Sequence, residues 1–277
     1  PPGAWAFQCG GVGDLLDHLG SQDVVAFTGS AATGRRIREH AGILSRSVRV
    51  NVEADSLNAM VVGPDVEVGS DTWDLFIREL AREVTQKSGQ KCTATRRVFL
   101  PEALIEPAVE ALREAFLDVP TGSAHEEGVR MGPLATPAQL PDVVAGLRRL
   151  AETAEVALGS IPDGEGATCA ALEPVVLIER SPLTNDLVHE LEVFGPCATL
   201  LPYDGAADSA VELVNRAGGC LVSSVYSDDK QFVTSTVSGI APWHGRVWVG
   251  SEKTMGHALG PGACLPGAIH GGPGRAG

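Results

Sequence analysis

Cys92 is the residue whose type and surroundings best suit nucleophilic chemistry. It lies in SGQKCTA, between a stretch with helical periodicity and an apolar stretch, and Lys87 and Lys91 are close to it in the chain. Positive charge near the end of a helix favours the thiolate form of cysteine, and even an unassisted thiol, with a pKa of about 8.5, is a good nucleophile. Buried structural cysteines are the commoner case. The local sequence therefore leaves a catalytic and a structural role open.

Glu53 is the acidic residue best placed to act as a general base. It lies near the end of SVRVNVEA, residues 47–54, whose alternation predicts a strand. Open α/β sheets bind their ligands at the carboxyl ends of their strands, and a carboxylate there can accept a proton from a thiol or a water. An exposed glutamate at a strand end is the ordinary alternative.

A glycine-containing turn is the candidate for binding cofactor phosphates. In GSAATG, Gly29 and Ser30 follow an apolar stretch, and Gly34 lies in the helix expected after it. Backbone N–H groups at a helix N-terminus can bind a pyrophosphate. The pattern is not Gly-x-Gly-x-x-Gly, and as Gly-x4-Gly it is a weak indication. A tight turn with an ordinary helix cap is the alternative.

Glu192 and Phe194 lie in HELEVFGP, which ends in a Gly-Pro turn. A carboxylate at this place can accept hydrogen bonds from a ribose, and a simple strand entry is the alternative. The seven histidines, His189 among them, show no metal-binding spacing and are interpreted as surface or structural residues. The six cysteines are scattered and contain no CxxC pair, so we expect no metal site.

The elements that must position these residues alternate along the chain. Residues 23–29 and 47–54 predict strands and residues 30–42 predict the helix between them, with residues 23–29 resembling a buried parallel strand. Further helices are predicted at 73–87, 103–119, 137–154 and 208–217, and further strands at 97–100, 173–179, 198–203, 220–227 and 246–250. Strands alternating with helices indicate an α/β catalytic domain.

The amino-terminal part predicts only a portion of a nucleotide-binding domain. One βαβ unit cannot bury both faces of its sheet, whereas doubly wound sheets usually have about five or six strands. We therefore expect residues 1–52 to be the carboxy-terminal remnant of such a domain. A Rossmann-like catalytic domain is expected at 53–250, followed by a Gly/Pro-rich tail at 251–277.

Charge and composition exclude several classes of partner. The formal net charge is −14, and so negative a field repels a phosphate backbone, which argues against nucleic acid. There is no run of about 18 apolar residues that would span a membrane, and the first residues do not form a signal peptide. Scattered cysteines fit reduced thiols. We expect a cytoplasmic enzyme that binds neither nucleic acid nor membranes.

Taken in chain order, five motifs resemble the aldehyde dehydrogenase superfamily: FTGSAATG, VEADSLNA, GQKCTA, MGPLATPAQ and EVFGP. The resemblance covers essentially the whole chain. EADSLNA, TQKSGQKCTATRRVFLP and HGGPGRAG are more closely similar to the aldehyde dehydrogenases of bacterial aerobic aromatic degradation. Members of that branch oxidise ring-opened CoA-thioester semialdehydes in phenylacetate or benzoate catabolism.

The resemblance implies a mechanism. Cys92 would attack an aldehyde, and hydride transfer to NADP or NAD from the resulting thiohemiacetal would leave a thioester. Glu53 would activate the water that hydrolyses it, and the Cys92 backbone N–H would donate to the oxyanion. The resemblance favours NADP, a small-molecule substrate in the form of a CoA-linked aldehyde, and a homo-oligomer of the full-length protein. The cofactor contacts that it implies are Gly29, Ser30, Gly34, Glu192 and Phe194.

Two departures from the family accompany the resemblance. Glu53 is followed by Ala54, Asp55 and Ser56, where Leu-Gly-Gly is more usual, and this fits the aromatic-degradation branch. The family's second oxyanion donor, an asparagine, and the lysine that binds the adenosine ribose belong to a segment that would precede residue 1. We infer a chain cut at both ends. Since one lost oxyanion donor costs about 2.7–4 kcal/mol, we expect little or no dehydrogenase activity from the chain alone.

Two alternatives stay open. The first is a fragment or pseudoenzyme without chemistry. The second is a CoA-acylating dehydrogenase, in which CoA rather than water resolves the thioester, and Glu53 argues against it because only water needs a base. A Cys–His thiol hydrolase has no support in the sequence beyond the presence of histidines.

Overall fold

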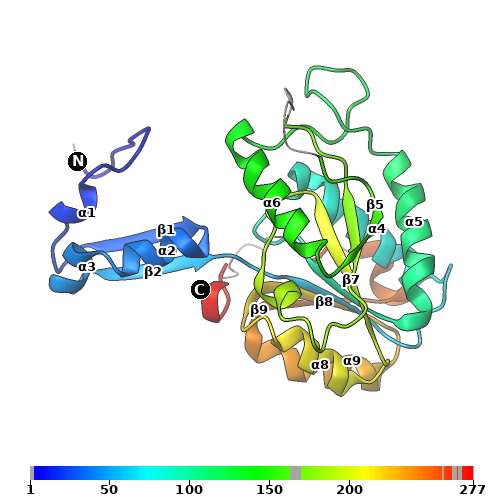
Figure 1. Ribbon diagram of the computed structural model, residues 1–277. Coiled ribbons are helices and arrows are strands. Elements are labelled where there is room, and N and C mark those ends of the chain that lie inside the picture. Colours follow the sequence, from blue (N-terminus) through cyan, green and yellow to red (C-terminus); the bar gives the residue numbers. More distant parts are fainter. Residues whose placement is uncertain (1–2, 163–169, 258, 264–266, 268–269, 277) are drawn as a thin grey trace. The chain divides into compact units, whose positions relative to one another are not determined.

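The computed structural model describes residues 3–162, 170–257, 259–263, 267 and 270–276. The chain divides into a small unit, Pro1–Asp55, and a large unit, Ser56–Ala276. Each unit has its own β-sheet (Figure 1). The division falls between Asp55 and Ser56, and the assignment of residues 1–52 to a cofactor-binding domain stays a prediction.

The small unit contains the expected βαβ arrangement. Strands β1 (Val24–Gly29) and β2 (Arg49–Ala54) pair in parallel, with Thr28 opposite Glu53. Helix α2 (Ala31–Arg38) lies between them in the chain. It packs closely on β2 because Gly34 has no side chain there, and a Cβ at Gly34 would overlap Val52. The expectation of a buried β1 is wrong within this unit, where most of the strand is exposed.

The helix expected at 30–42 is two helices. After α2, the chain begins α3 (Ala41–Ser45) at His40, whose Nδ1 accepts a hydrogen bond from the Gly42 N–H at 3.2 Å. A side-chain acceptor at this position satisfies one of the N–H groups that a helix start leaves open. Histidine is not among the usual capping residues, which is why the break was not visible in the sequence. A short helix α1 (Leu15–His18) precedes β1.

Within the described residues of the large unit, seven strands form one sheet in the order β5-β6-β7-β4-β3-β8-β9. All neighbours are parallel except β5, which is antiparallel to β6. Strands covered on both faces read as continuous apolar runs, and β3, β6, β7 and β8 are buried along their whole length. The strands are β3 (Ala59–Val62), β4 (Arg97–Pro101), β5 (Glu155–Leu158), β6 (Val175–Ile178), β7 (Cys197–Tyr203), β8 (Cys220–Tyr226) and β9 (His244–Gly250).

Helices cover both faces of this sheet and complete a three-layer α/β architecture (Figure 1). Side chains alternate along each strand, so Met60 and Val62 pack with α4 and α5, while Ala59 and Val61 pack with α8 and α9. Helix α6 packs beside the latter two on the same face of β6 and β7. The helices are α4 (Asp71–Thr85), α5 (Ile105–Leu117), α6 (Leu140–Leu150), α7 (Leu187–Glu190), α8 (Ala207–Asn215) and α9 (Lys230–Ile240).

Short 3-10 helices occupy several connections and part of the carboxy-terminal segment. They are η1 (Gln86–Gly89), η2 (Glu102–Leu104), η3 (Pro137–Gln139), η4 (Ala241–Trp243), η5 (Glu252–His257) and η6 (Gly274–Ala276). Among the described residues, no helix combines the length and the apolar character that crossing a membrane requires.

Candidate active site

The loop that carries Cys92 connects α4 to β4 and begins with three residues in the left-handed conformation. These are Lys87, Ser88 and Gly89, with φ of 54°, 55° and 68°. In residues other than glycine this conformation is strained, and such backbone strain is common at functional sites. The Ser88 hydroxyl donates to the Gly132 carbonyl at 2.7 Å, so the segment MGPLATPAQ supports the strained turn.

Three further contacts fix the same loop, two from the EVFGP segment and one from MGPLATPAQ. A Cβ at Gly89 would overlap the backbone of Gly195, so only glycine allows the two segments to approach this closely. Gln90 Nε2 donates to the Phe194 carbonyl at 3.3 Å, and Gln90 Oε1 accepts from the Ala135 N–H at 2.7 Å. The motifs GQKCTA, MGPLATPAQ and EVFGP therefore form one connected surface around the cysteine loop.

Asn58 holds the backbone of the nucleophile itself. Its Nδ2 donates to the Cys92 carbonyl at 2.8 Å and to the Ala94 carbonyl at 2.9 Å. Its Oδ1 accepts from the Ser56 hydroxyl at 2.7 Å and from the Val222 N–H at 3.0 Å. Asn58 is buried, and a buried amide with all of these partners fixes the loop in one position.

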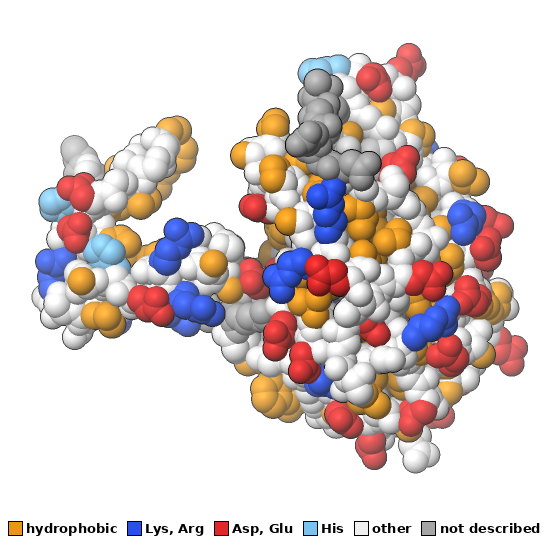
Figure 2. All heavy atoms as spheres, viewed as in Figure 1, with side chains coloured by type: hydrophobic (Ala, Val, Ile, Leu, Met, Phe, Trp, Pro, Cys, Tyr) orange, Lys and Arg blue, Asp and Glu red, His pale blue; other side chains and the backbone are white. Residues whose placement is uncertain are grey.

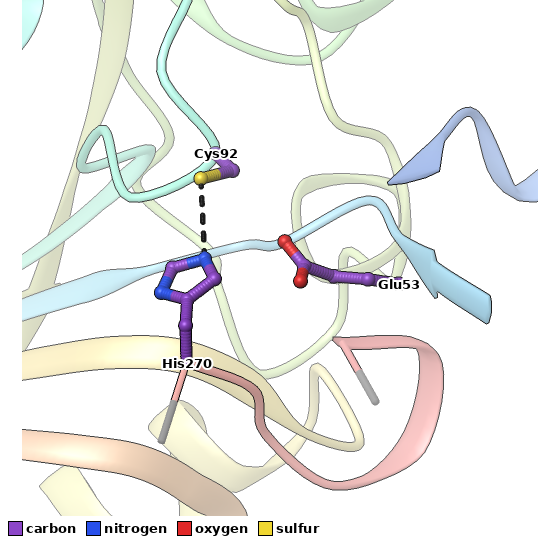
Figure 3. Close-up of side chains that lie close together, drawn as sticks. All are labelled: Glu53, Cys92 and His270. Carbon is purple, nitrogen blue, oxygen red and sulfur yellow. Dashed lines mark hydrogen bonds between the residues drawn. The ribbon is translucent and has the colours of Figure 1, made fainter. Parts of the chain in front are cut away.

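The Cys92 thiol is partly buried and lies beside an imidazole. Its Sγ is 3.5 Å from Nε2 of His270, which comes from the carboxy-terminal segment (Figure 3). On its apolar side, Cys92 packs against a cluster of Leu221, Val222 and Ala276. The sulfur therefore touches a titratable group and is not enclosed in hydrocarbon.

Lys91 does not serve the thiol in the way that its position in the chain suggested. Its Nζ lies 2.8 Å from Glu83 Oε1 and 2.9 Å from Gln86 Oε1. The Glu83 side chain is only 1% exposed, so the lysine charge is paired with a buried carboxylate. Lys87 is exposed.

Burial distinguishes the other described cysteines from Cys92. Cys197 is buried, and this burial raises the pKa of its thiol to about 11. Cys220 is buried as well, and its thiol donates to the Leu57 carbonyl at 3.1 Å. Cys9 is exposed in the small unit. Cys169 and Cys264 lie outside the described residues.

Glu192 is held by protein donors inside the large unit. Arg96 Nε lies 3.3 Å from Glu192 Oε1, and the Ser56 N–H donates to Oε2 at 2.8 Å. Arg96 also donates to the carbonyls of Gly195 and Gly89, each at 2.8 Å. One buried guanidinium thus ties the loop of Glu192 to the loop of Cys92. The carboxylate is 6% exposed.

Phe194 lies at the surface next to this network. Its ring is 38% exposed, and the Arg96 guanidinium carbon is 5.6 Å from the ring centre. An aromatic face stacked on one side by a cation and open on the other can accept a flat ligand ring. Phe194 and Glu192 are both positioned through Arg96.

The remaining candidates belong to the small unit. Glu53 is partly buried near the end of β2. Ser30 caps α2: its hydroxyl oxygen accepts from the Thr33 N–H at 3.3 Å, and Asp55 Oδ1 accepts from the Ala31 N–H at 3.1 Å. Gly29 ends β1, and Gly34 is explained by the packing of α2 on β2. The structure thus gives Ser30 and Gly34 clear local roles, and their cofactor contacts stay predictions.

Sequence reasoning did not assign three residues that organise the site. Asn58 and Arg96 lie inside the motifs VEADSLNA and TATRRVFLP, and His270 begins HGGPGRAG. The histidines were expected to be surface or structural residues. His270 does lie at the surface, but its contact with Cys92 was not expected. The sequence showed that each motif contains a polar residue, which could have marked these three as candidates. Only the fold shows which atoms their side chains contact.

Comparison with known proteins agrees with this architecture. The model of the aldehyde dehydrogenase family matches residues 1–262. A 3,4-dehydroadipyl-CoA semialdehyde dehydrogenase of Aromatoleum evansii is 43% identical over 278 residues, which is 99% of this chain and 54% of that protein. The chain spans about half the length of the curated relatives that it matches.

Solved structures show the same fold at low sequence identity. An NAD-dependent aldehyde dehydrogenase from Sinorhizobium meliloti matches with a TM-score of 0.74 and 24% identity, over 92% of this chain and 46% of that one. A betaine aldehyde dehydrogenase from Staphylococcus aureus matches with a TM-score of 0.77 and 20% identity, over 95% of this chain and 50% of that one. With the family model matching nearly the whole sequence, the chain belongs to the aldehyde dehydrogenase family.

Proposed function

We propose that this protein oxidises an aldehyde to a carboxylic acid with a nicotinamide dinucleotide, and that Cys92 is the nucleophile. The observation that carries the proposal is the fixation of the Cys92 loop. Ser88, Gln90 and Asn58 anchor its backbone from separate segments, while the thiol stays partly exposed. Holding a nucleophile in one geometry lowers the entropic part of the barrier, whereas a merely structural cysteine needs no such anchoring.

The chemistry follows from the groups at this loop. The Cys92 thiolate adds to the aldehyde carbon, and the alkoxide forms where the Cys92 backbone N–H can donate to it. NAD(P)+ supplies the hydride acceptor. The thioester that remains on the sulfur is then hydrolysed by water. We assign Glu53 as the base that activates this water, since hydrolysis at neutral pH needs a proton acceptor.

Covalent connectivity supports the role of Glu53. Only Ala54 and Asp55 separate it from Ser56, and three residues of extended chain span at most about 11 Å. Ser56 in turn hydrogen-bonds Asn58, which holds the Cys92 carbonyl. The carboxylate is therefore tethered by a short segment to the network that positions the nucleophile.

Three candidates fit the cofactor by their chemistry. The N-terminus of α2, at which Ser30 and Asp55 accept hydrogen bonds from the N–H groups of Thr33 and Ala31, is the kind of position at which a pyrophosphate binds. A carboxylate has about four acceptor positions, so Glu192 can accept a ribose hydroxyl in addition to Arg96 and Ser56. Phe194 offers an exposed ring for the nicotinamide. We propose these contacts together with Gly29 and Gly34 at the α2 turn.

The substrate, the cofactor type and the assembly are proposed from relatives. The Aromatoleum evansii relative is named for a CoA semialdehyde, so we propose a CoA-linked semialdehyde from aromatic catabolism. The Staphylococcus aureus structure contains NAD+, which supports a nicotinamide dinucleotide. NADP in preference to NAD stays a proposal, as do a homo-oligomer and a cytoplasmic location.

The proposal is tested by following reduced nicotinamide after the full-length protein is mixed with a CoA-thioester semialdehyde and either NAD+ or NADP+. Cys92→Ser is expected to lower turnover by roughly 10³-fold or more, because the nucleophile is lost. Glu53→Gln is expected to give a stoichiometric burst of reduced nucleotide followed by slow turnover, because the thioester forms but its hydrolysis lacks a base. The ratio of kcat/KM for NADP+ to that for NAD+ tests the cofactor preference.

Matched variants keep the result interpretable. Cys9→Ser removes an exposed thiol and Glu67→Gln an exposed carboxylate, and both are expected to leave turnover within about twofold. Unchanged turnover in Cys92→Ser would refute the proposal and favour a protein without this chemistry. A new thioester in place of a free carboxylate, formed only with added CoA and insensitive to Glu53→Gln, would identify a CoA-acylating enzyme instead.

A further inference from the structure

We propose that His270 is the proton acceptor for the Cys92 thiol and the ion-pair partner of its thiolate. The inference rests on the proposed role of Cys92 as nucleophile and adds a catalytic residue to it. Its basis is the 3.5 Å contact between Cys92 Sγ and His270 Nε2 (Figure 3). A neutral imidazole can accept the S–H proton, and the imidazolium can then donate to the thiolate.

Three cationic side chains of the large unit are engaged with other protein groups. Lys91, its neighbour in the chain, is bound to the buried Glu83 and to Gln86. Arg96 points away to Glu192 and to two carbonyls. Arg246 donates from Nη1 to the Ala263 carbonyl. His270 Nε2, in contrast, lies within hydrogen-bonding distance of the sulfur, at 3.5 Å.

The carboxy-terminal segment is fitted to deliver His270 to this place. The Gly271 backbone lies so close to Gly245 in β9 that a Cβ at Gly245 would overlap its carbonyl oxygen. Farther along, Ala276 joins Leu221 and Val222 in the apolar cluster against which Cys92 packs. The segment that begins with His270 is thus packed against the first residues of β8 and β9. The same packing places it next to Cys92.

The proposed step conserves protons and electrons. The S–H bond of Cys92 breaks and its proton moves to His270 Nε2, which gives a thiolate and an imidazolium. The sulfur lone pair forms the S–C bond to the aldehyde carbon, and the π electrons of the C=O bond move to oxygen. A bound nicotinamide dinucleotide would supply the acceptor for the hydride on that carbon. After hydrolysis of the thioester the sulfur departs as thiolate, and the imidazolium returns the proton or remains its ion-pair partner.

The test is the pH profile of the alkylation of Cys92 by iodoacetamide, followed peptide by peptide with mass spectrometry. At about pH 6 an unassisted thiol with a pKa of about 8.5 is ionised to well under 1%. Pairing with an imidazole raises the thiolate fraction, although a more acidic thiol is less nucleophilic per ion. We expect His270→Asn to slow Cys92 alkylation by about 10-fold or more at pH 6 and by less than about twofold near pH 9.5.

Three variants accompany this measurement. Gly245→Ala displaces the carboxy-terminal segment while keeping both side chains, and is expected to reproduce the His270→Asn profile. His125→Asn changes an exposed histidine of another loop and is expected to keep the wild-type profile. Glu53→Gln separates the proposed hydrolytic base from the proton acceptor, and is expected to leave the alkylation profile unchanged at acidic pH. His270 is exposed, so its replacement is not expected to unfold the protein.

The outcomes separate this inference from the proposed function. If Cys92 reacts faster than Cys9 in the wild type but its pH profile is the same in His270→Asn, the role of His270 is refuted while Cys92 remains the candidate nucleophile. If the acidic limb of the profile disappears in Glu53→Gln and not in His270→Asn, Glu53 is the acceptor instead. If Cys92 reacts no faster than Cys9 at any pH, the proposed function itself fails.

Discussion

The two described sheets of this molecule, one parallel and one almost wholly parallel, differ in what covers them. In the small unit, β1 is mostly exposed, and Val24 retains 54% of its surface. In the large unit, helices lie on both faces of the sheet, and Val98 in β4 is 0% exposed. Both strands contain valine, and each pairs in parallel with a neighbour. The helices packed on a strand, and not the composition of the strand, therefore decide how much stability an apolar residue contributes.

The same contrast applies to charged groups. Arg97 in β4 is fully buried, and its guanidinium donates to the carbonyls of Leu57 and Val214 at 3.0 and 2.9 Å. In the small unit, Arg46 is exposed and donates to the Asp17 carbonyl at 2.7 Å. A contact of similar length is replaceable by water at the surface but not in the core. Substitutions should therefore have much larger effects in the large unit.

The largest expected effect comes from Arg97→Met, with Arg46→Met as its counterpart in the small unit. Loss of the Arg97 guanidinium removes a donor from the buried carbonyls of Leu57, Leu213 and Val214, of which Leu57 keeps the weak S–H donor of Cys220. Each unsatisfied buried group costs about 1–3 kcal/mol. We expect Arg97→Met to lower the free energy of unfolding by roughly 3–5 kcal/mol and Arg46→Met by less than about 1 kcal/mol. Urea unfolding followed by circular dichroism measures both. Equal losses would show that the two environments do not differ as described.

The next effect is a pH dependence of the large unit. Burial lowers the pKa of both His189 and His244 to about 4, and for His189 the nearby Arg97 adds to the effect. In the unfolded chain a histidine has a pKa of about 6.5, so between these values the unfolded state binds more protons. Stability is therefore complete above about pH 6.5 and falls as the pH is lowered towards 4.

The free energy of unfolding falls by about 2 kcal/mol per histidine near pH 5 and by roughly 3 kcal/mol per histidine at the acidic limit. Pulsed hydrogen exchange with mass spectrometry, after equilibration in urea at each pH, reports the unfolding of peptides from the large unit separately. His244→Gln keeps a donor for the Ile240 carbonyl that His244 Nδ1 contacts, and is expected to remove about half of the pH dependence. An unchanged slope would mean that His244 is protonated in the folded protein.

Much of the large unit could be predicted from sequence because its pattern is periodic. The strands at 198–203 and 220–227 and the helix at 73–87 appear within a few residues of β7, β8 and α4. Four elements of the large unit, β3, β5, α7 and α9, were not predicted. For two of them the physical reason is plain. β3 has four residues and directly follows the VEADSLNA motif, and α9 mixes Ser, Thr and Gly between its inward positions, Phe232, Thr236 and Ile240.

The candidate site was predictable only where one residue carries the chemistry. Cys92 could be chosen because its motif is local, although the expected help from Lys91 was wrong. Asn58 and His270 could not be chosen, because their contacts with Cys92 join residues 34 and 178 positions apart. Such pairs depend on how strands are ordered in the sheet and where the carboxy-terminal segment lies. Periodicity contains neither kind of information.

The smallest expected effect is the difference between the same substitution, valine to alanine, made once in each sheet. Val98→Ala in β4 removes two methyl groups from a fully buried site, which costs about 1.6 kcal/mol of transfer free energy and, with the cavity term, roughly 2 kcal/mol in total. Val24→Ala in β1 removes the same groups from a side chain that is already half in solvent, so less than about 0.5 kcal/mol is expected. Urea unfolding of the two variants gives both values. A cost near 2 kcal/mol for Val24→Ala would mean that β1 is covered in solution, for example by a second copy of the chain, and the concentration dependence of that cost would distinguish association from packing within one chain.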